Sequence, residues 1–238
     1  MKIQHLSRDR MRRQAARWHD AEMSGRTYCL TPGQTPPRTS ALPEAALTFI
    51  SDSDTGAILF WSQAQAHLVV PPFPVQRSAE HTGWHAGPLQ SLLDTPRTVA
   101  VLLLRLGGLA VGVFEGERLV ASKVGSPFVK GRHKKGGSSS GRFARRREGQ
   151  ARALFDKACE TLRNVVGPHR DRLDHLVLGG DRHTLQDFEK RCPYLTTYAG
   201  IRLRRVLNVP EPRLKVLQGA GRLLYISQVA TFRPSLED

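Results

Sequence analysis

The chain has 238 residues, of which 39% are hydrophobic, and it carries a formal net charge of +15 at pH 7. This length allows one large domain or two small ones, and the apolar content is sufficient for a core. Because the positive charge is clustered, a protein that binds nucleic acid is favoured over a generally basic protein without such a partner. No apolar run approaches membrane-span length, and the basic N-terminus lacks an apolar h-region, so we expect neither a membrane span nor a secretory signal.

The three cysteines, Cys29, Cys159 and Cys192, are odd in number and far apart in the sequence. They form neither a C-x-x-C pair nor a zinc-type spacing with histidine. We therefore expect reduced cysteines in a cytoplasmic protein. Two further histidines, His81 and His85, do not by themselves indicate a metal site, and no cofactor is expected.

Residues 5–23 predict a basic helix, with one apolar stripe formed by Met11, Ala15, Trp18 and Met23. Its arginines are equally consistent with RNA contact and with a solvated face: Arg8, Arg10, Arg12, Arg13 and Arg17.

The rest of the first 95 residues predicts a small β-rich region. Thr31–Pro43 is rich in Pro, Thr and Gly, which indicates a linker or an irregular loop. Ala46–Ile50 and Ala57–Trp61 predict two strands joined by a turn, and His67–Val70 predicts another strand. We expect an N-terminal region of residues 1–95, ending at a composition shift near Pro96.

The second predicted domain, residues 96–238, begins with a three-stranded meander. Thr98–Arg105 is a continuous apolar run typical of a buried strand. Leu109–Phe114 and Arg118–Val124 predict the next two strands, with short turns between them.

A basic Gly/Ser segment follows the meander. Residues 118–147 contain ten Lys and Arg but no acidic residue, whereas a solvated face usually mixes both signs. A one-sign run around a glycine loop indicates a polyanionic partner. The adjacent Gly136 and Gly137 allow close approach of the backbone to that partner.

After the loop, apolar residues recur at helical spacing from Phe143 to Val166, and Ser139 or Ser140 can cap this helix. Its first turns carry several arginines, although a helix N-terminus favours anions. A bound phosphate would relieve this conflict. Gly167-Pro168 ends the helix.

The remaining segments complete a mixed α/β layer fold. They are predicted as a strand at Leu173–Leu178, a helix at Thr184–Arg191, short segments at Leu203–Val209 and Arg213–Leu217, and a strand at Leu223–Ala230.

Competing motifs in this domain are weak. Gly137-Ser138-Ser139-Ser140-Gly141 matches G-x-S-x-G, but Lys134-Lys135 precede it where a nucleophile elbow needs a hydrophobic strand. The segment from Gly131 lacks the final Lys-Ser/Thr of a P-loop. Gly179-Gly180-Asp181 is better explained as a βα turn than as a phosphate site.

Taken together, residues 97–229 resemble the catalytic middle domain of eukaryotic and archaeal peptide release factors. They are still more similar to the bacterial branch of the Vms-like release factors, a peptidyl-tRNA hydrolase family of ribosome-associated quality control. The motifs that carry this resemblance are Lys135-Gly136-Gly137, Arg142-Phe143-Ala144-Arg145-Arg146-Arg147 and Leu176-Val177-Leu178-Gly179-Gly180-Asp181-Arg182.

The resemblance implies that the glycine loop enters the peptidyl-transferase centre and that a glutamine beside the glycines positions water against the peptidyl-tRNA ester. The catalytic segment would be Gly136, Gly137, Ser138, Ser139 and Ser140. The RNA-binding residues would be Lys130, Arg132, Lys134, Lys135, Arg142, Arg145, Arg146 and Arg147. This chain has no glutamine in the loop; the position falls on Ser138, Ser139 or Ser140, and the nearest glutamine is Gln150.

Two functions therefore stay open. The first is a release factor that hydrolyses peptidyl-tRNA on stalled large subunits. The second is a ribosome- and tRNA-binding quality-control factor that keeps the docking surface without the catalyst. Both imply the large ribosomal subunit, its rRNA and peptidyl-tRNA as partners, with other quality-control factors as further candidates.

Overall fold

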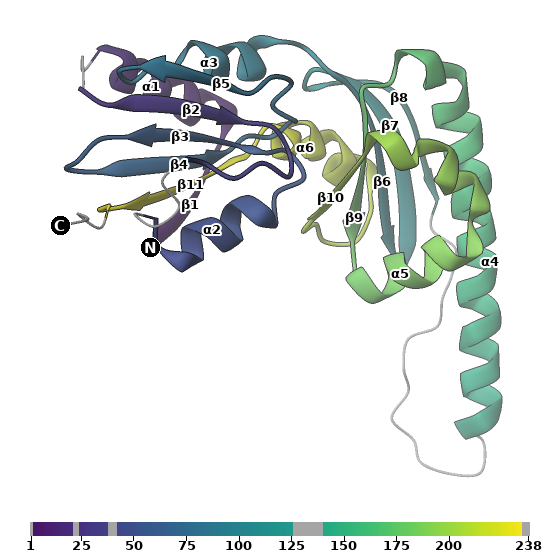
Figure 1. Ribbon diagram of the computed structural model, residues 1–238. Coiled ribbons are helices and arrows are strands. Elements are labelled where there is room, and N and C mark those ends of the chain that lie inside the picture. The colour runs from purple at the N-terminus through teal and green to yellow at the C-terminus, as the bar shows by residue number, and fades with distance from the viewer. Residues whose placement is uncertain (1, 21–23, 38–41, 126–139, 235–238) are drawn as a thin grey trace. The chain divides into compact units, whose positions relative to one another are not determined.

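The computed structural model describes residues 2–20, 24–37, 42–125 and 140–234 (Figure 1). The chain divides into two compact units. The first comprises residues 1–96 together with 222–238, and the second comprises residues 97–221. No helix in the described parts of the chain is long and apolar enough to cross a membrane.

The first unit contains a six-stranded antiparallel sheet with the order β1-β11-β4-β3-β2-β5. Two of these strands confirm predicted ones, since β3 and β4 correspond to the apolar runs before and after residues 62–65. The bounds are β1 (Lys2–Leu6), β2 (Arg26–Leu30), β3 (Ala57–Trp61), β4 (Ala66–Val70), β5 (Ala79–Thr82) and β11 (Ser227–Phe232).

Helices cover both faces of this sheet (Figure 1). On one face, α1 (Arg8–Asp20) and α3 (Gly87–Asp94) pack against strand residues that include Ile58. On the other face, α2 (Glu44–Ser51) packs against residues that include Leu59. Neighbouring strand residues point to opposite faces, which is why adjacent positions of β3 serve two different clusters. The described members of the predicted helix stripe are buried: Met11, Ala15 and Trp18.

Two predictions for this unit were wrong. Residues 46–50 lie in helix α2, because Pro43 precedes the helix and the buried Ala46 and Ile50 stand four positions apart on its inner side. His5 belongs to strand β1, so the first helix begins only at Arg8.

The C-terminal strand also differs from expectation. Residues 222–238 were expected in the second domain, but β11 pairs antiparallel with β1 and with β4 of the first unit. Ala230 lies opposite Ile3 on one side and Leu68 on the other. This pairing joins segments that are far apart in the sequence, so no local sequence pattern predicts it.

The second unit contains a five-stranded mixed sheet with the order β10-β9-β6-β7-β8. The predicted meander is confirmed, because β6, β7 and β8 are antiparallel neighbours. Strands β9 and β10 extend the sheet in parallel with β6. The bounds are β6 (Thr98–Arg105), β7 (Gly108–Glu115), β8 (Arg118–Gly125), β9 (His175–Gly180) and β10 (Arg202–Leu207).

One face of this sheet carries α4 (Ser140–Val166) and α5 (Arg182–Arg191), whose apolar residues share one core with Leu102 and Val111. Two 3-10 segments connect these elements, η2 (Gly167–Arg172) and η3 (Pro193–Ile201). On the opposite face, Gly112 leaves room for Leu217 of α6 (Leu214–Leu224). The unit is therefore the mixed α/β layer fold that the sequence predicts.

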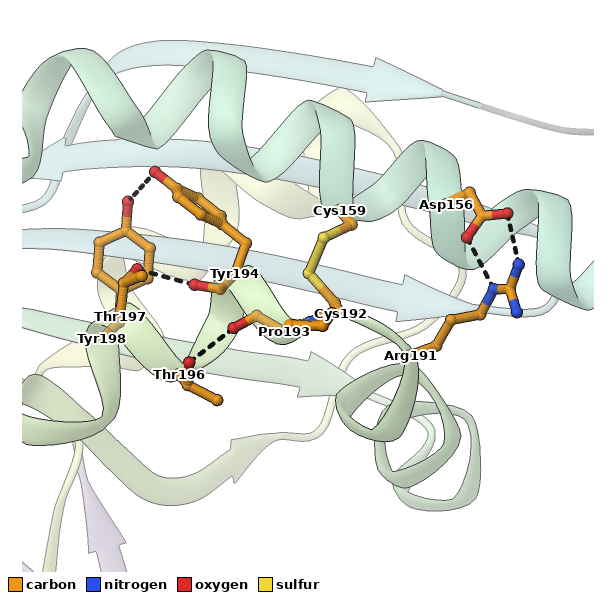
Figure 2. Close-up of a disulfide and its surroundings, with 9 residues drawn as sticks. All are labelled: Asp156, Cys159, Arg191, Cys192, Pro193, Tyr194, Thr196, Thr197 and Tyr198. Carbon is orange, nitrogen blue, oxygen red and sulfur yellow. Dashed lines mark hydrogen bonds and ion pairs between the residues drawn. A yellow bond between two sulfur atoms is a disulfide. The ribbon is translucent and has the colours of Figure 1, made fainter.

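The expectation of three reduced cysteines was wrong. Cys159 of α4 and Cys192 at the end of α5 form a disulfide across 33 sequence positions (Figure 2). Cys29 is a free thiol buried in the first unit. The two bonded cysteines meet because α4 and the α5–η3 junction lie on the same face of the sheet, a relationship that cysteine spacing does not encode.

Candidate functional site

The N-terminal half of α4 lies beyond the core of the second unit. Its first described fully buried side chain is Leu154, whereas Arg145, Arg147 and Glu148 are exposed. Figure 1 shows this end of the helix extending past the edge of the sheet. Among the described side chains of these turns, Arg145 and Arg147 therefore lie at the surface, outside the buried core.

The structure describes only part of the predicted site. Ser140 opens α4, and Arg142 and Arg146 lie within the helix next to Arg145 and Arg147. The other predicted residues lie outside the described residues: Lys130, Arg132, Lys134, Lys135, Gly136, Gly137, Ser138 and Ser139. Their catalytic and RNA-binding roles remain predictions.

The electrostatics of the start of α4 favour an anion. The first turn contains no acidic residue, while the partial positive charge of the helix dipole is concentrated there. The first carboxylate of the helix, Glu148, is paired with Arg152. A polyanion at this end would offset both the dipole and the arginine charges.

The C-terminal half of α4 is fixed to the α5–η3 junction by three contacts, and Figure 2 shows two of them, the ion pair and the disulfide. Asp156 accepts two hydrogen bonds from Arg191, at 2.7 and 2.8 Å. Cys159 is bonded to Cys192. Since these α4 positions are three apart, both lie on the same side of the helix.

The third contact is Arg163, four positions further along. Its guanidinium carbon lies 5.0 Å from the centroid of the Tyr194 ring, a cation–π contact. The Tyr194 hydroxyl is 2.8 Å from the hydroxyl of the buried Tyr198. Burial and this hydrogen bond raise the pKa of Tyr198, so the Tyr198 hydroxyl stays protonated at neutral pH.

The Asp156–Arg191 pair also shifts the ionisation of its members. The hydrogen bond from Arg191 lowers the pKa of Asp156, and the same bond raises the pKa of Arg191. Both groups are therefore charged across the neutral range. This keeps the Arg191 guanidinium plane in one orientation.

The β9–α5 connection is an ordinary βα turn, as predicted from the sequence. Gly180 adopts a φ of +118°, and a Cβ there would lie 2.0 Å from the Leu104 carbonyl oxygen, so only glycine fits. Asp181 caps α5 by accepting hydrogen bonds from the Thr184 amide and hydroxyl, both at 2.8 Å. These bonds lower the pKa of Asp181.

The arginines of α1 divide into two groups. Arg8 donates to the Leu93 carbonyl oxygen at 2.7 Å and Arg12 pairs with Asp94, so these two hold α1 against the end of α3. Arg10, Arg13 and Arg17 are exposed. Within the described residues, no group of three or more His, Cys, Asp or Glu is arranged to hold a metal ion.

A protein-family model identifies the family of the chain. The family model described as "Actinobacteria/chloroflexi VLRF1 release factor" matches residues 97–229, which is more than half of the chain. The chain belongs to this acVLRF1 family. The match covers the whole second unit, including the exposed end of α4.

Curated relatives of this acVLRF1 protein are similar over about half of the chain. Peptide chain release factor subunit 1 of Archaeoglobus fulgidus is 28% identical over 123 residues, which is 51% of this chain and 30% of the relative. Its counterpart in Methanopyrus kandleri is 29% identical over 125 residues, 52% of this chain and 30% of the relative. The matched region thus spans less than a third of these longer proteins.

Among solved structures, the archaeal translation termination factor aRF1 is similar with a TM-score of 0.43 at 16% identity. That comparison covers 92% of this chain and 73% of the other.

Sequence reasoning missed the residues that fix α4. Asp156, Cys159 and Arg163 form a row at spacings of three and four, which is a weak signal that one side of the helix faces a partner element. Their partners lie 31 to 35 positions away, so only the tertiary structure identifies them.

Proposed function

We propose that this acVLRF1 protein is a cytoplasmic translation rescue factor that hydrolyses the ester of peptidyl-tRNA on stalled large ribosomal subunits, within ribosome-associated quality control. One observation carries most of the weight: the arginine-rich end of α4 extends outward immediately after the Gly/Ser loop. Membership of a release-factor family supports the same function. The partners would be rRNA and peptidyl-tRNA, together with other quality-control factors.

RNA binding would depend on charges on both sides of the loop. Arg145 and Arg147 are exposed on α4, and phosphate contacts of this kind position a protein on RNA without reading its sequence. The remaining contacts would come from the lead-in and the same helix turns: Lys130, Arg132, Lys134, Lys135, Arg142 and Arg146.

The proposed chemistry is attack of water on the ester carbonyl. Gly136 and Gly137 would allow the backbone to approach the ester, and backbone amides would stabilise the developing oxyanion, often the largest contribution in acyl transfer. Ser138, Ser139 and Ser140 would line the water site. A serine hydroxyl offers one donor, whereas a glutamine amide offers two donors and an acceptor, so this site would depend more on the backbone amides.

One sequence observation favours a second candidate function. The segment 126–139 contains no glutamine, which is the residue that the release-factor resemblance places beside the glycines. A factor without it would keep the basic docking surface of α4 and would bind large subunits without cleaving the ester.

Peptide release from large subunits that carry labelled peptidyl-tRNA separates the two candidates. The natural protein would be compared with Ser138→Gln, Ser139→Gln and Ser140→Gln. Release by the natural protein supports the rescue factor with a serine-type loop. No release by the natural protein, together with release by one glutamine variant, would instead establish a docking factor and fix the register of the loop.

A further inference from the structure

The second unit has a cavity of about 570 Å³ on the face of the sheet that carries α4 and α5. It lies where β6 and β9 end, between Leu106 in the turn after β6 and Asp181 at the start of α5. The carboxyl ends of parallel strands are the usual ligand-binding edge of an α/β sheet, and this volume is in the range of small-ligand sites. None of the functions argued above uses this cavity.

One wall of the cavity is apolar. Leu106 is 48% exposed, and it lines the cavity together with the half-buried Ala151 and the buried Phe155. A flat apolar ligand that covered Leu106 would remove this surface from water.

A second wall offers a planar cation held in a fixed orientation. Arg191 lines the cavity, and its guanidinium donates to both carboxylate oxygens of Asp156. The next residue, Cys192, is covalently tied to α4 through Cys159 (Figure 2). Guanidinium planes are stacking surfaces for unpaired bases, and prior fixation lowers the entropic cost of binding.

The rim carries both donors and acceptors. Asp181 and Asp187 present carboxylates, which accept hydrogen bonds from amino and ring N–H groups of a base. Arg147 and His183 supply donors and positive charge at the same opening. Arg147 belongs to the arginine-rich turns of α4, so the cavity opens beside the surface that is proposed to bind RNA.

We propose that this cavity binds one unpaired RNA nucleotide, with the base in the space lined by Leu106, Phe155 and Arg191 and the phosphate toward Arg147. The proposal rests on the proposed RNA-directed function and adds to it a specific subsite. It predicts a preference for single-stranded over double-stranded RNA, because only an unstacked base can enter the cavity.

The test uses two tryptophan substitutions on one helix. Ala151→Trp fills the cavity, while Ala153→Trp places the same ring on an exposed position about 200° around α4 and outside the cavity. Fluorescence anisotropy would measure the binding of the full chain to a labelled single-stranded RNA and to the matching duplex.

The proposal predicts that Ala151→Trp weakens binding of the single strand about fivefold or more, the effect of losing one stacked base. Ala153→Trp would bind like the natural protein, and all three proteins would bind the duplex equally. The salt dependence would not change, because no charge is altered. Equal affinity of both tryptophan variants for the single strand would overturn the proposal.

Two milder variants keep the test decisive if Ala151→Trp perturbs folding. Leu106→Ser alters only an exposed turn residue. Arg191→Lys keeps the positive charge but removes the planar guanidinium on which a base could stack. Both are expected to weaken binding of the single strand, and natural affinity in both would also refute the subsite. Peptide release is read separately: normal release with unaffected RNA binding removes only the subsite, whereas subsite-dependent RNA binding without release removes only the proposed chemistry.

Discussion

Cys159, in the C-terminal half of α4, is covalently bonded to Cys192, which directly follows the end of α5. The chain between the two cysteines contains η2, β9 and α5. The start of this segment follows α4 directly, and the bond joins its end back to α4, the helix that carries the candidate site. The same helix carries the exposed Arg145 and Arg147 near its other end.

Reduction of the disulfide is expected to lower the free energy of unfolding by about 2–4 kcal/mol, since a loop of this length restricts the unfolded chain. Urea unfolding with and without dithiothreitol measures the effect. The variant Cys159→Ala/Cys192→Ala is the control, because its unfolding midpoint should not respond to the reductant. An unchanged midpoint for the natural protein under both conditions would show that the bond contributes nothing to stability.

Substitution of Gly180 should be strongly destabilising. Gly180→Ala places a Cβ 2.0 Å from the Leu104 carbonyl oxygen at a φ of +118°, so the β9–α5 turn must distort, at a cost of about 3 kcal/mol or more. The matched control is Gly149→Ala in α4, where the described residues place no atom within 4 Å of the added methyl group apart from the adjacent backbone of the helix itself. That change is expected to stabilise the protein by about 0.5–1 kcal/mol. Equal melting temperatures for the two variants would contradict this account of the turn.

The Asp156–Arg191 pair should give a small, pH-dependent contribution to stability. The hydrogen bond lowers the pKa of Asp156 in the folded state, so its contribution is complete above the pKa of the unfolded chain. It is lost as the pH falls through the folded-state value. Asp156→Asn should therefore be less stable than the natural protein at pH 7 and equally stable in strong acid, with the difference reduced by salt. A difference that stays constant down to low pH would exclude this ionisation as its cause.

The charges of α4 should determine the salt dependence of RNA binding. Arg145→Glu/Arg147→Glu is expected to weaken binding to large subunits and to reduce the slope of log affinity against log salt, because fewer counterions are released. Arg213→Glu is the control, since Arg213 is an exposed cation outside α4. If the double variant and the control have the same slope as the natural protein, these arginines do not face RNA.

The sequence predicted the second unit well because its signals are local. The apolar run 98–105 matches β6 residue for residue, and Gly167-Pro168 ends α4 where predicted. The first unit was harder, because residues 46–50 are apolar in either a strand or a short helix, and only Pro43 and the packing of Ile50 decide between them. Tertiary partners such as Cys159 with Cys192, or Ile3 with Ala230, carry no local signal.

The candidate site also has one part that could be predicted from the sequence and one part that could not. The charge of Arg145 and Arg147 is evident from the sequence, and the structure adds that both side chains are exposed on an extended helix end. The cavity beside Ala151 and Arg191 was not predicted, because its walls come from the β6–β7 turn, α4 and α5. Segments this far apart meet only through the order of strands in the sheet.

The most direct test of the central claim is peptide release from purified large subunits carrying labelled peptidyl-tRNA, with the natural protein beside Gly136→Val/Gly137→Val. The account predicts release by the natural protein and none by the valine variant, while both bind subunits with the same salt dependence. Circular dichroism of the variant would verify its fold. Undiminished release by the valine variant, or binding without release by the natural protein, would contradict a hydrolase that acts through this loop.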